Sequence, residues 1–127
     1  MDNLLTFLKI ISDETRLRII MLLNKKELCV CEICDILNLS QPKVSRHLTK
    51  LRDTGFVKND REGQWIFYCL NMEDELMKDI VKKIEENIDS FSALKNDKLM
   101  LAKKQQKGIM CERQAEKKRN VEAFKKL

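Results

Sequence analysis

A mainly α-helical domain with a β-hairpin is the fold class that this sequence predicts, in the arrangement of a winged helix-turn-helix. Apolar residues recur at helical spacing as far as residue 53. A three-residue connection, Asn38-Leu39-Ser40, separates two short helical segments, and the apolar period changes to two shortly after the second segment. Two short helices joined by a tight turn and followed by a hairpin are the plan of a winged helix-turn-helix.

Four helices are predicted before the hairpin. They cover residues 3–11, a second stretch that Ser12 caps and that ends near Leu23, residues 30–37 and residues 41–53. Ser40 is a good cap for the fourth helix, and Gly55 is typical of a residue that ends one.

The hairpin is predicted from two stretches of period-two alternation, Phe56–Lys58 and Gln64–Leu70, with turn-forming residues 59–63 between them. A fifth helix follows over residues 73–91, with an apolar stripe along one side. We therefore expect residues 1–91 to form one DNA-binding and sensing domain. Residues 92–127 are expected to form a basic extension, helical or partly disordered.

Charge is unevenly spread along the chain. The total of +5 divides into −2 for residues 1–91 and +7 for residues 92–127. Any nucleic-acid contact in the first part must therefore come from a local patch rather than from general positive charge. The basic extension is interpreted either as a solvated helix or as an arm that binds phosphates.

A cytoplasmic location is expected. The longest apolar run, Ile19–Leu23, is far shorter than the roughly 20 residues of a membrane span. The N-terminus carries no basic segment before its apolar stretch, so neither a secretory signal nor a membrane partner is predicted. In the cytoplasm clustered cysteines are ligands or reactive groups more often than disulfides.

The predicted fourth helix has an apolar side and a polar side. Val44, Leu48 and Leu51 share the side expected to face the core. Hydroxyl, amide and basic side chains at a helix start are the groups that read bases and hold phosphates in the major groove. The predicted DNA contacts are Ser40, Gln41, Lys43, Ser45, Arg46, His47, Thr49 and Lys50, with Lys58, Arg61 and Gln64 in the hairpin. The alternative is a solvated amphipathic helix.

His47 is the only histidine, and by helical phase it lies at the edge of the apolar side. A packed, hydrogen-bonded histidine is the first interpretation and a DNA contact the second. Metal ligation is least expected because the sequence offers no second histidine. Trp65 in the hairpin is expected to belong to the core.

Three thiols, Cys29, Cys31 and Cys34, fall within six residues. Thiolates are soft ligands and select soft ions. Three of them without a histidine suit a three-coordinate centre such as arsenic(III) or antimony(III), whereas cadmium, lead and zinc normally require a fourth ligand. No catalytic cofactor is expected.

Other interpretations of the cysteines stay open. An alternative is that the three thiols are small buried hydrophobic residues on a core helix. A redox pair of Cys31 and Cys34 fits the C-x-x-C spacing, although no βαβ setting accompanies it. Cys69 is expected in the core. Cys111 is expected to be a surface thiol or an accessory ligand.

Helical geometry restricts how three thiols reach one ion. Around a helix axis Cys31 and Cys34 lie only about 60° apart, whereas Cys29 and Cys31 lie about 160° apart. A regular helix therefore cannot present all three sulfurs to one ion. Either Cys29 precedes the helix and folds back, or ion capture unwinds the first turn.

Four segments resemble the ArsR family of metal-responsive repressors. They are the stretches D-E-T-R-L-R-I, E-L-C-V-C-E-I-C, L-S-Q-P-K-V-S-R-H-L and D-R-E-G-Q-W-I-F-Y, within residues 4–91. The resemblance implies a homodimer that is not an enzyme and that represses an arsenical-resistance operon through operator DNA. It also implies arsenite or antimonite as inducer, held by Cys29, Cys31 and Cys34, and a dimer interface formed by the first and fifth helices.

A cadmium- or lead-responsive repressor of the same family is the alternative. Those sensors share the C-V-C stretch, but the resemblance would also require cysteines in an N-terminal extension, which this sequence does not show. The zinc sensors of the family use histidine and acidic ligands on the last helix. Residues 73–91 carry the acids without a histidine.

Overall fold

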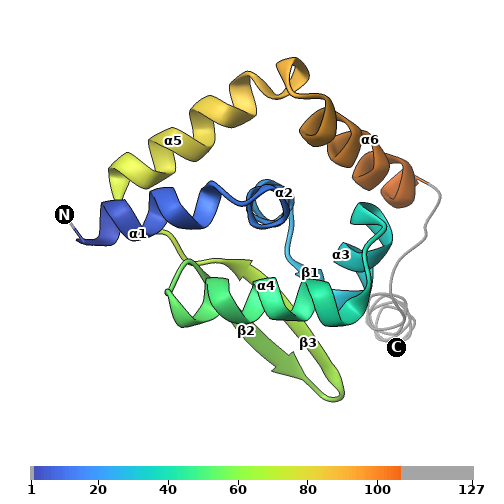
Figure 1. Cartoon of the computed structure of the whole chain (residues 1–127). Helices are drawn as coiled ribbons and strands as arrows, with labels where there is room; N and C mark the ends of the chain where they lie inside the picture. The colour runs from blue at the N-terminus through green and yellow to red at the C-terminus, as the bar shows by residue number, and fades with distance from the viewer. Residues whose placement is uncertain (1, 107–127) are drawn as a thin grey trace, which may run out of the picture.

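The computed structural model describes residues 2–106, with the side chains of residues 3–104, and forms a winged helix-turn-helix (Figure 1). Cys111 and the rest of the sequence after residue 106 lie outside the described residues. The elements are α1 (Asp2–Ile11), α2 (Glu14–Lys25), β1 (Leu28–Cys29), α3 (Val30–Leu37), α4 (Gln41–Asp53), β2 (Val57–Glu62), β3 (Trp65–Leu70), α5 (Glu75–Glu86), the 3-10 helix η1 (Ile88–Ser90) and α6 (Ser92–Gln106).

Polar caps fix where the helices begin. Ser40 caps α4 as predicted, because its hydroxyl accepts the backbone N–H of Lys43 at 3.4 Å. The prediction of Ser12 as the cap of α2 is wrong. Asp13 accepts the Arg16 N–H at 3.0 Å, while the Ser12 hydroxyl donates to the carbonyl of Lys9 at the end of α1. A carboxylate also interacts favourably with the helix dipole, which favours Asp13 at this position.

The core is built around α2, which is seen end-on between the other helices in Figure 1. Ile19 and Ile20 are completely buried. Phe7 of α1 and Phe56, just after α4, meet edge to face with ring centroids 5.4 Å apart. No helix among residues 2–106 has the length and apolar character needed to cross a membrane.

The sheet has the order β1-β3-β2 and is antiparallel throughout. The hairpin of β2 and β3 extends away from the helices as the wing (Figure 1). The five-residue turn predicted over residues 59–63 is wrong, because β2 continues to Glu62 and the loop is only Gly63 and Gln64. Gly63 adopts a φ of 60°, and glycine in the first position of a two-residue loop permits so tight a turn.

Strand β1 was not predicted. Its two residues pair with the middle of the wing strand, Leu28 with Tyr68 and Cys29 with Phe67. Two residues are too few to show a period of two, so the sequence carries no signal for this strand. The pairing attaches the segment before α3 to the sheet.

The predicted helix over residues 73–91 is divided in the structure. α5 ends at Glu86, and the Asn87 side chain donates to the carbonyl of Lys83 at 2.8 Å. An asparagine side chain that bonds the backbone in this way competes with the helical hydrogen bonds. The chain then turns through η1, which buries Ile88, into α6.

α6 packs back on the helices before it. It contacts α2 and α3 and buries Leu94 and Leu101. Asp97 of α6 is also buried, against Arg18 of α2. The domain boundary at residue 91 stays a prediction.

Candidate nucleic-acid interface and thiol site

Helix α4 has the two-sided character that the sequence predicts. Val44, Leu48 and Leu51 are completely buried. On the other side lie most of the predicted DNA contacts. Ser40, Gln41, Lys43, Arg46, Thr49 and Lys50 are exposed, and Ser45 and His47 are half-buried. Because of the cap at Ser40, Gln41 is the first residue of the helix.

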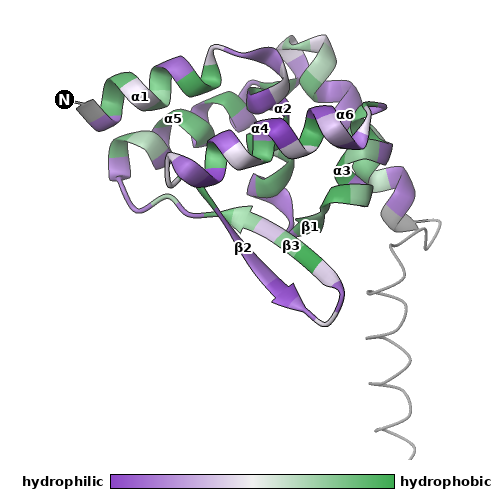
Figure 2. Ribbon diagram, turned by 60° about the horizontal axis from the view of Figure 1, so that its bottom comes forward, coloured by the Kyte–Doolittle hydropathy of each residue, from purple (hydrophilic) through white to green (hydrophobic). Residues whose placement is uncertain are grey.

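The wing places three more predicted contacts in solvent. Lys58, Arg61 and Gln64 are exposed, and β2 is hydrophilic along most of its length (Figure 2). The Arg61 Nε donates to the carbonyl of Gly63 at 3.3 Å, which holds this guanidinium beside the turn. α4 contacts β2, so the helix and the wing belong to one continuous surface. Trp65, predicted in the core, is half-buried.

His47 packs inward from α4 toward the start of α2. Its Nδ1 lies 3.9 Å from Oδ1 of Asp13, an ion-pair distance rather than the hydrogen bond that was expected. Burial lowers the pKa of His47, and the nearby cations of Arg16, Arg46 and Lys43 lower it further, against the opposing effect of Asp13. The pKa of Asp13 is itself lowered, first by the backbone N–H of Arg16.

Cys29 precedes the helix that carries the other two thiols. Its backbone is extended, with φ −85° and ψ 166°, and α3 begins only at Val30. The Cys29 N–H donates to Oε1 of Glu32 at 3.0 Å, and the side chain is 98% buried, with a relative exposure of 2%. Cys29 therefore lies outside the helix, as in the first of the two predicted arrangements, whereas the joining of all three sulfurs on one ion stays a prediction.

The other two thiols differ in exposure. Cys31 is exposed, and its Sγ lies 2.8 Å from the Sγ of Cys29. Cys34 is half-buried. Burial raises the pKa of the Cys34 thiol, and the neighbouring Cys31 raises it further. Within residues 3–104, no group of three or more histidine, cysteine or acidic side chains is arranged to hold a metal ion. Capture of one ion by all three thiols therefore requires a local rearrangement.

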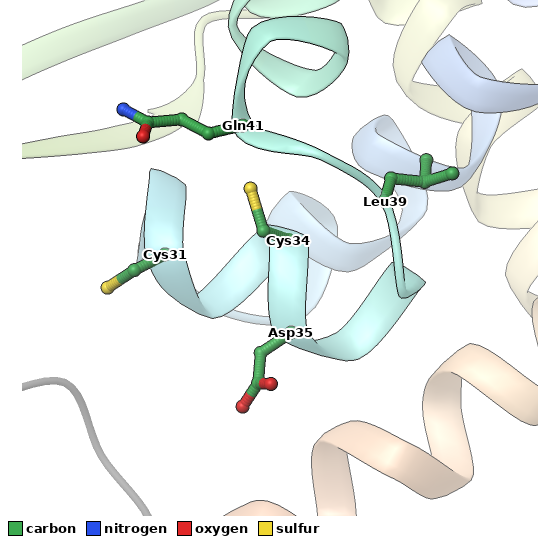
Figure 3. Close-up of a pocket in the computed structure, with 5 residues that line it drawn as sticks. All are labelled: Cys31, Cys34, Asp35, Leu39 and Gln41. Carbon is green, nitrogen blue, oxygen red and sulfur yellow. The ribbon is translucent and has the colours of Figure 1, made fainter.

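A surface pocket of about 390 Å³ lies between two of the thiols, Cys31 and Cys34, and the start of α4 (Figure 3). It is lined by Cys31, Cys34, Asp35, Leu39 and Gln41. The sequence reasoning missed Asp35 and Leu39. Asp35 could have been predicted, because its carboxylate directly follows Cys34 in the sequence. Leu39 has no ligand atom in its side chain that would have indicated a role in the site.

α6 reaches the same helix from its other side. The Lys104 Nζ lies 2.7 Å from Oδ2 of Asp35, one residue after Cys34. No sequence pattern connects these two residues, which are far apart in the chain. Cys69, predicted in the core, is half-buried in β3 at the position paired with Lys58.

The sequence family described as "Bacterial regulatory protein, arsR family" matches residues 13–59. The arsenic resistance transcriptional regulator ArsR1 of Pseudomonas putida is 43% identical over 84 residues, which cover 61% of this chain and 66% of that protein. The arsenical resistance operon repressor of Staphylococcus aureus is 37% identical over 82 residues, covering 65% of this chain and 77% of that protein.

Another relative is named for a different metal, and a further one has a solved structure. The cadmium resistance transcriptional regulatory protein CadC of Listeria innocua is 41% identical over 65 residues, covering 50% of this chain and 55% of that protein. The structure of HlyU from Vibrio cholerae matches with a TM-score of 0.62 and 33% identity over 67% of this chain and 90% of that chain. The chain spans between 55% and 66% of the length of ArsR1 and two further curated regulators that it matches.

Proposed function

Since this chain is a member of the arsR family of regulatory proteins, we propose that it is a transcriptional repressor of an arsenical-resistance operon. It binds operator DNA as a homodimer and leaves the DNA when Cys29, Cys31 and Cys34 capture arsenic(III) or antimony(III). The observation that carries this proposal is a group of three soft thiols at and within α3, two of which, Cys31 and Cys34, line a pocket with the first residue of α4, the proposed recognition helix.

The DNA-binding part of the proposal rests on α4 and the wing. N-terminal residues of a recognition helix contact base edges in the major groove, and a wing adds contacts to the backbone. The exposed Arg46 offers a fork that matches guanine, and Lys43 and Lys50 offer charges for phosphates. No catalytic step is part of the proposal.

The dimer part rests on apolar side chains that α1 and α5 leave exposed. Leu5 and Leu8 of α1 and Leu76 of α5 are 49%, 43% and 52% exposed. A contiguous patch of exposed apolar side chains marks a surface that another protein covers, and we propose that those of α1 and α5 form such a patch. A two-fold pairing through this surface presents two recognition helices to successive major grooves of a palindromic operator.

The capture step exchanges oxygen for sulfur without electron transfer. Arsenous acid, As(OH)3, carries three hydroxyl groups. Each thiol gives its proton to one departing hydroxyl, which leaves as water, and an As–S bond replaces the As–O bond. The product is a neutral tris-thiolate centre. The soft thiolates favour this exchange over binding of hard cations.

Release from DNA follows from the rearrangement that capture requires. Drawing Cys34 and the contacting sulfurs of Cys29 and Cys31 onto one ion changes the start of α3, on which α4 rests across the connection at residues 38–40. The ion therefore favours a conformation that DNA disfavours. Linkage then requires operator DNA to weaken arsenite binding by the same factor by which arsenite weakens operator binding.

The test is operator affinity with and without arsenite, measured by fluorescence anisotropy on the DNA upstream of the chain's own gene. We expect arsenite to release the wild type and not Cys34→Ser. Cys69→Ser is the matched control, because it removes a half-buried thiol outside the cluster and should respond like the wild type. Operator binding that is insensitive to arsenite in the wild type contradicts the proposal.

A cadmium- or lead-responsive repressor is the second candidate, favoured by the likeness to a cadmium resistance regulator. A divalent ion normally takes a fourth ligand, and we assign this role to the Asp35 carboxylate, which lines the pocket and would have to exchange its ion pair with Lys104 for the metal. Asp35→Asn should weaken release by cadmium and leave release by arsenite unchanged. Equal sensitivity of the wild type to cadmium and arsenite favours the second candidate.

A further inference from the structure

We propose that Gln41 is the residue through which the thiol pocket controls the recognition helix. Gln41 belongs to both sites: it lines the pocket beside Cys31 and Cys34, and it is the first residue of α4. This inference rests on the proposed function and adds to it a specific coupling residue.

The pocket lies between the thiols and the start of α4. Figure 3 shows the sulfur of Cys34 pointing from α3 toward the beginning of α4, whereas Asp35 points away from it. Gln41 lies at that beginning, on the opposite side of the pocket from α3. A ligand drawn to the thiol of Cys34 therefore comes to lie against the first residue of the recognition helix.

A movement of Cys34 reaches Gln41 through the short backbone connection between α3 and α4. The Leu39 N–H donates to the carbonyl of Cys34 at 3.1 Å. Asn38 adopts the left-handed conformation with φ 56°, which asparagine tolerates better than most residues. Ser40 is then held by its cap to Lys43. This connection therefore links Cys34 to Gln41 over a few residues, beside the direct packing of α3 on α4.

The Gln41 side chain has a separate use on DNA. Its amide carries both a donor and an acceptor, and glutamine pairs with adenine through both groups in the major groove. The side chain is exposed at the helix start, where base contacts are made. An amide that turns to a thiolate or to the ion in the pocket is no longer available to a base. Capture therefore removes a DNA contact as well as displacing the helix.

Lys43 provides a matched control. It lies in the same turn of α4 and is exposed, but it is not among the residues that line the pocket. Lys43→Ala should weaken operator binding to the same degree with and without arsenite. Gln41→Ala should instead make operator binding less sensitive to arsenite.

The experiment measures the ratio of operator Kd with arsenite to operator Kd without it, for wild type, Gln41→Ala and Lys43→Ala. Low salt keeps weakened variants bound to DNA. We expect a wild-type ratio within the ordinary range of about 5–150 and a Gln41→Ala ratio below about 5. X-ray absorption should show the same number of sulfur neighbours around arsenic in all three proteins, which shows that the thiol site itself is intact.

Three results overturn the inference. A Gln41→Ala ratio equal to that of the wild type removes Gln41 from the coupling. A ratio lowered equally in Lys43→Ala assigns the coupling to the helix start in general rather than to this side chain. A wild type that arsenite does not release overturns the proposed function itself, and the coupling with it.

Discussion

Arg18 of α2 holds Asp97 of α6 with two parallel hydrogen bonds. Its Nε donates to Oδ2 at 2.8 Å, and a terminal guanidinium nitrogen donates to Oδ1 at 2.9 Å. The Asp97 side chain is 2% exposed, so its charge depends on this one guanidinium. The hydrogen bonds to Asp97 raise the pKa of Arg18 above its ordinary value. The pair fixes α6 to the central helix.

Arg18→Met should destabilise the protein by about 3–5 kcal/mol, because it leaves the Asp97 carboxylate buried without a cation. The double variant Arg18→Met/Asp97→Leu should recover most of this loss. Lys78→Ala is the control, since it removes an exposed ion pair with Glu75 and should cost less than about 1 kcal/mol. Urea unfolding at one fixed protein concentration measures all three. Equal losses for the two single variants contradict the role of the buried pair.

Because of His47, the free energy of unfolding should decrease in mild acid. Its folded pKa lies below the ordinary value of about 6.5 because of burial. The unfolded chain therefore binds the proton more readily, and the free energy of unfolding decreases as the pH falls below about 6.5. The decrease ends once the pH is below the folded pKa.

Replacing the titrating group tests this effect. His47→Gln should remove the slope in that pH range when unfolding is followed at several pH values. The contribution of Asp13, whose pKa is also lowered, is lost only below its ordinary value of about 3.9. In His47→Gln the free energy of unfolding should therefore still fall with pH in the more acidic range where Asp13 titrates. An unchanged slope near pH 6 means that another group titrates there.

Two basic residues of α4 should differ in what they contribute to DNA binding. Arg46→Ala should cost about 1–3 kcal/mol on the operator and little on unrelated DNA, if its guanidinium reads a base. Lys50→Ala should weaken binding to operator and to unrelated DNA, and it should reduce the slope of log affinity against log salt concentration by about 1. Salt titrations of operator and unrelated DNA separate the two effects. The assignment of α4 as the recognition helix fails if neither variant changes operator affinity.

Cys29→Ser should keep operator binding and lose the response to arsenite. The hydroxyl fits where the thiol is, and the N–H of residue 29 can still donate to Glu32, so α3 keeps its start. The soft ion loses one of three ligands. Operator affinity is measured with and without arsenite, alongside the number of sulfur neighbours of arsenic. If the variant is released as readily as the wild type, then Cys31 and Cys34 are sufficient for induction.

Leu76→Glu should prevent formation of the proposed dimer and leave a monomer. A buried, unpaired carboxylate in an apolar interface is costly. Leu99→Glu of α6 is a control of closely matched exposure, 51% against 52%, on a helix outside the proposed interface. Sedimentation equilibrium distinguishes the two. Dissociation by both substitutions extends the interface to α6, and dissociation by neither excludes α5 from it.

Most of the fold could be predicted because its signals are local. The apolar side of α4 is defined by three residues within one helix, and the predicted ends of α3, Val30 and Leu37, coincide with those of the structure. The short loop at Gly63 and the end of α5 at Asn87 also have local causes. Each depends on the backbone conformation or the hydrogen bonding of a single residue. The spacing of apolar residues carries no information about these single-residue effects.

The candidate site was predicted only in its residue types. The sequence places three thiols near one another, but it does not show that Cys29 belongs to a strand or that Gln41 faces the same pocket as Cys34. Those relationships depend on contacts between elements, as does the pair of Lys104 and Asp35. Spacing along one helix carries no information about them.

The pairing of Cys29 with Phe67 also sets an order of events during folding. The backbone hydrogen bonds of α4 join near neighbours in the sequence, whereas this pairing closes a long loop whose entropy must be lost before the contact is gained. On a ribosome, Cys29 cannot take its place in the sheet before β3 has been synthesised. In a newly made chain all residues of α4 are therefore present before the strand that pairs with the first thiol has been synthesised.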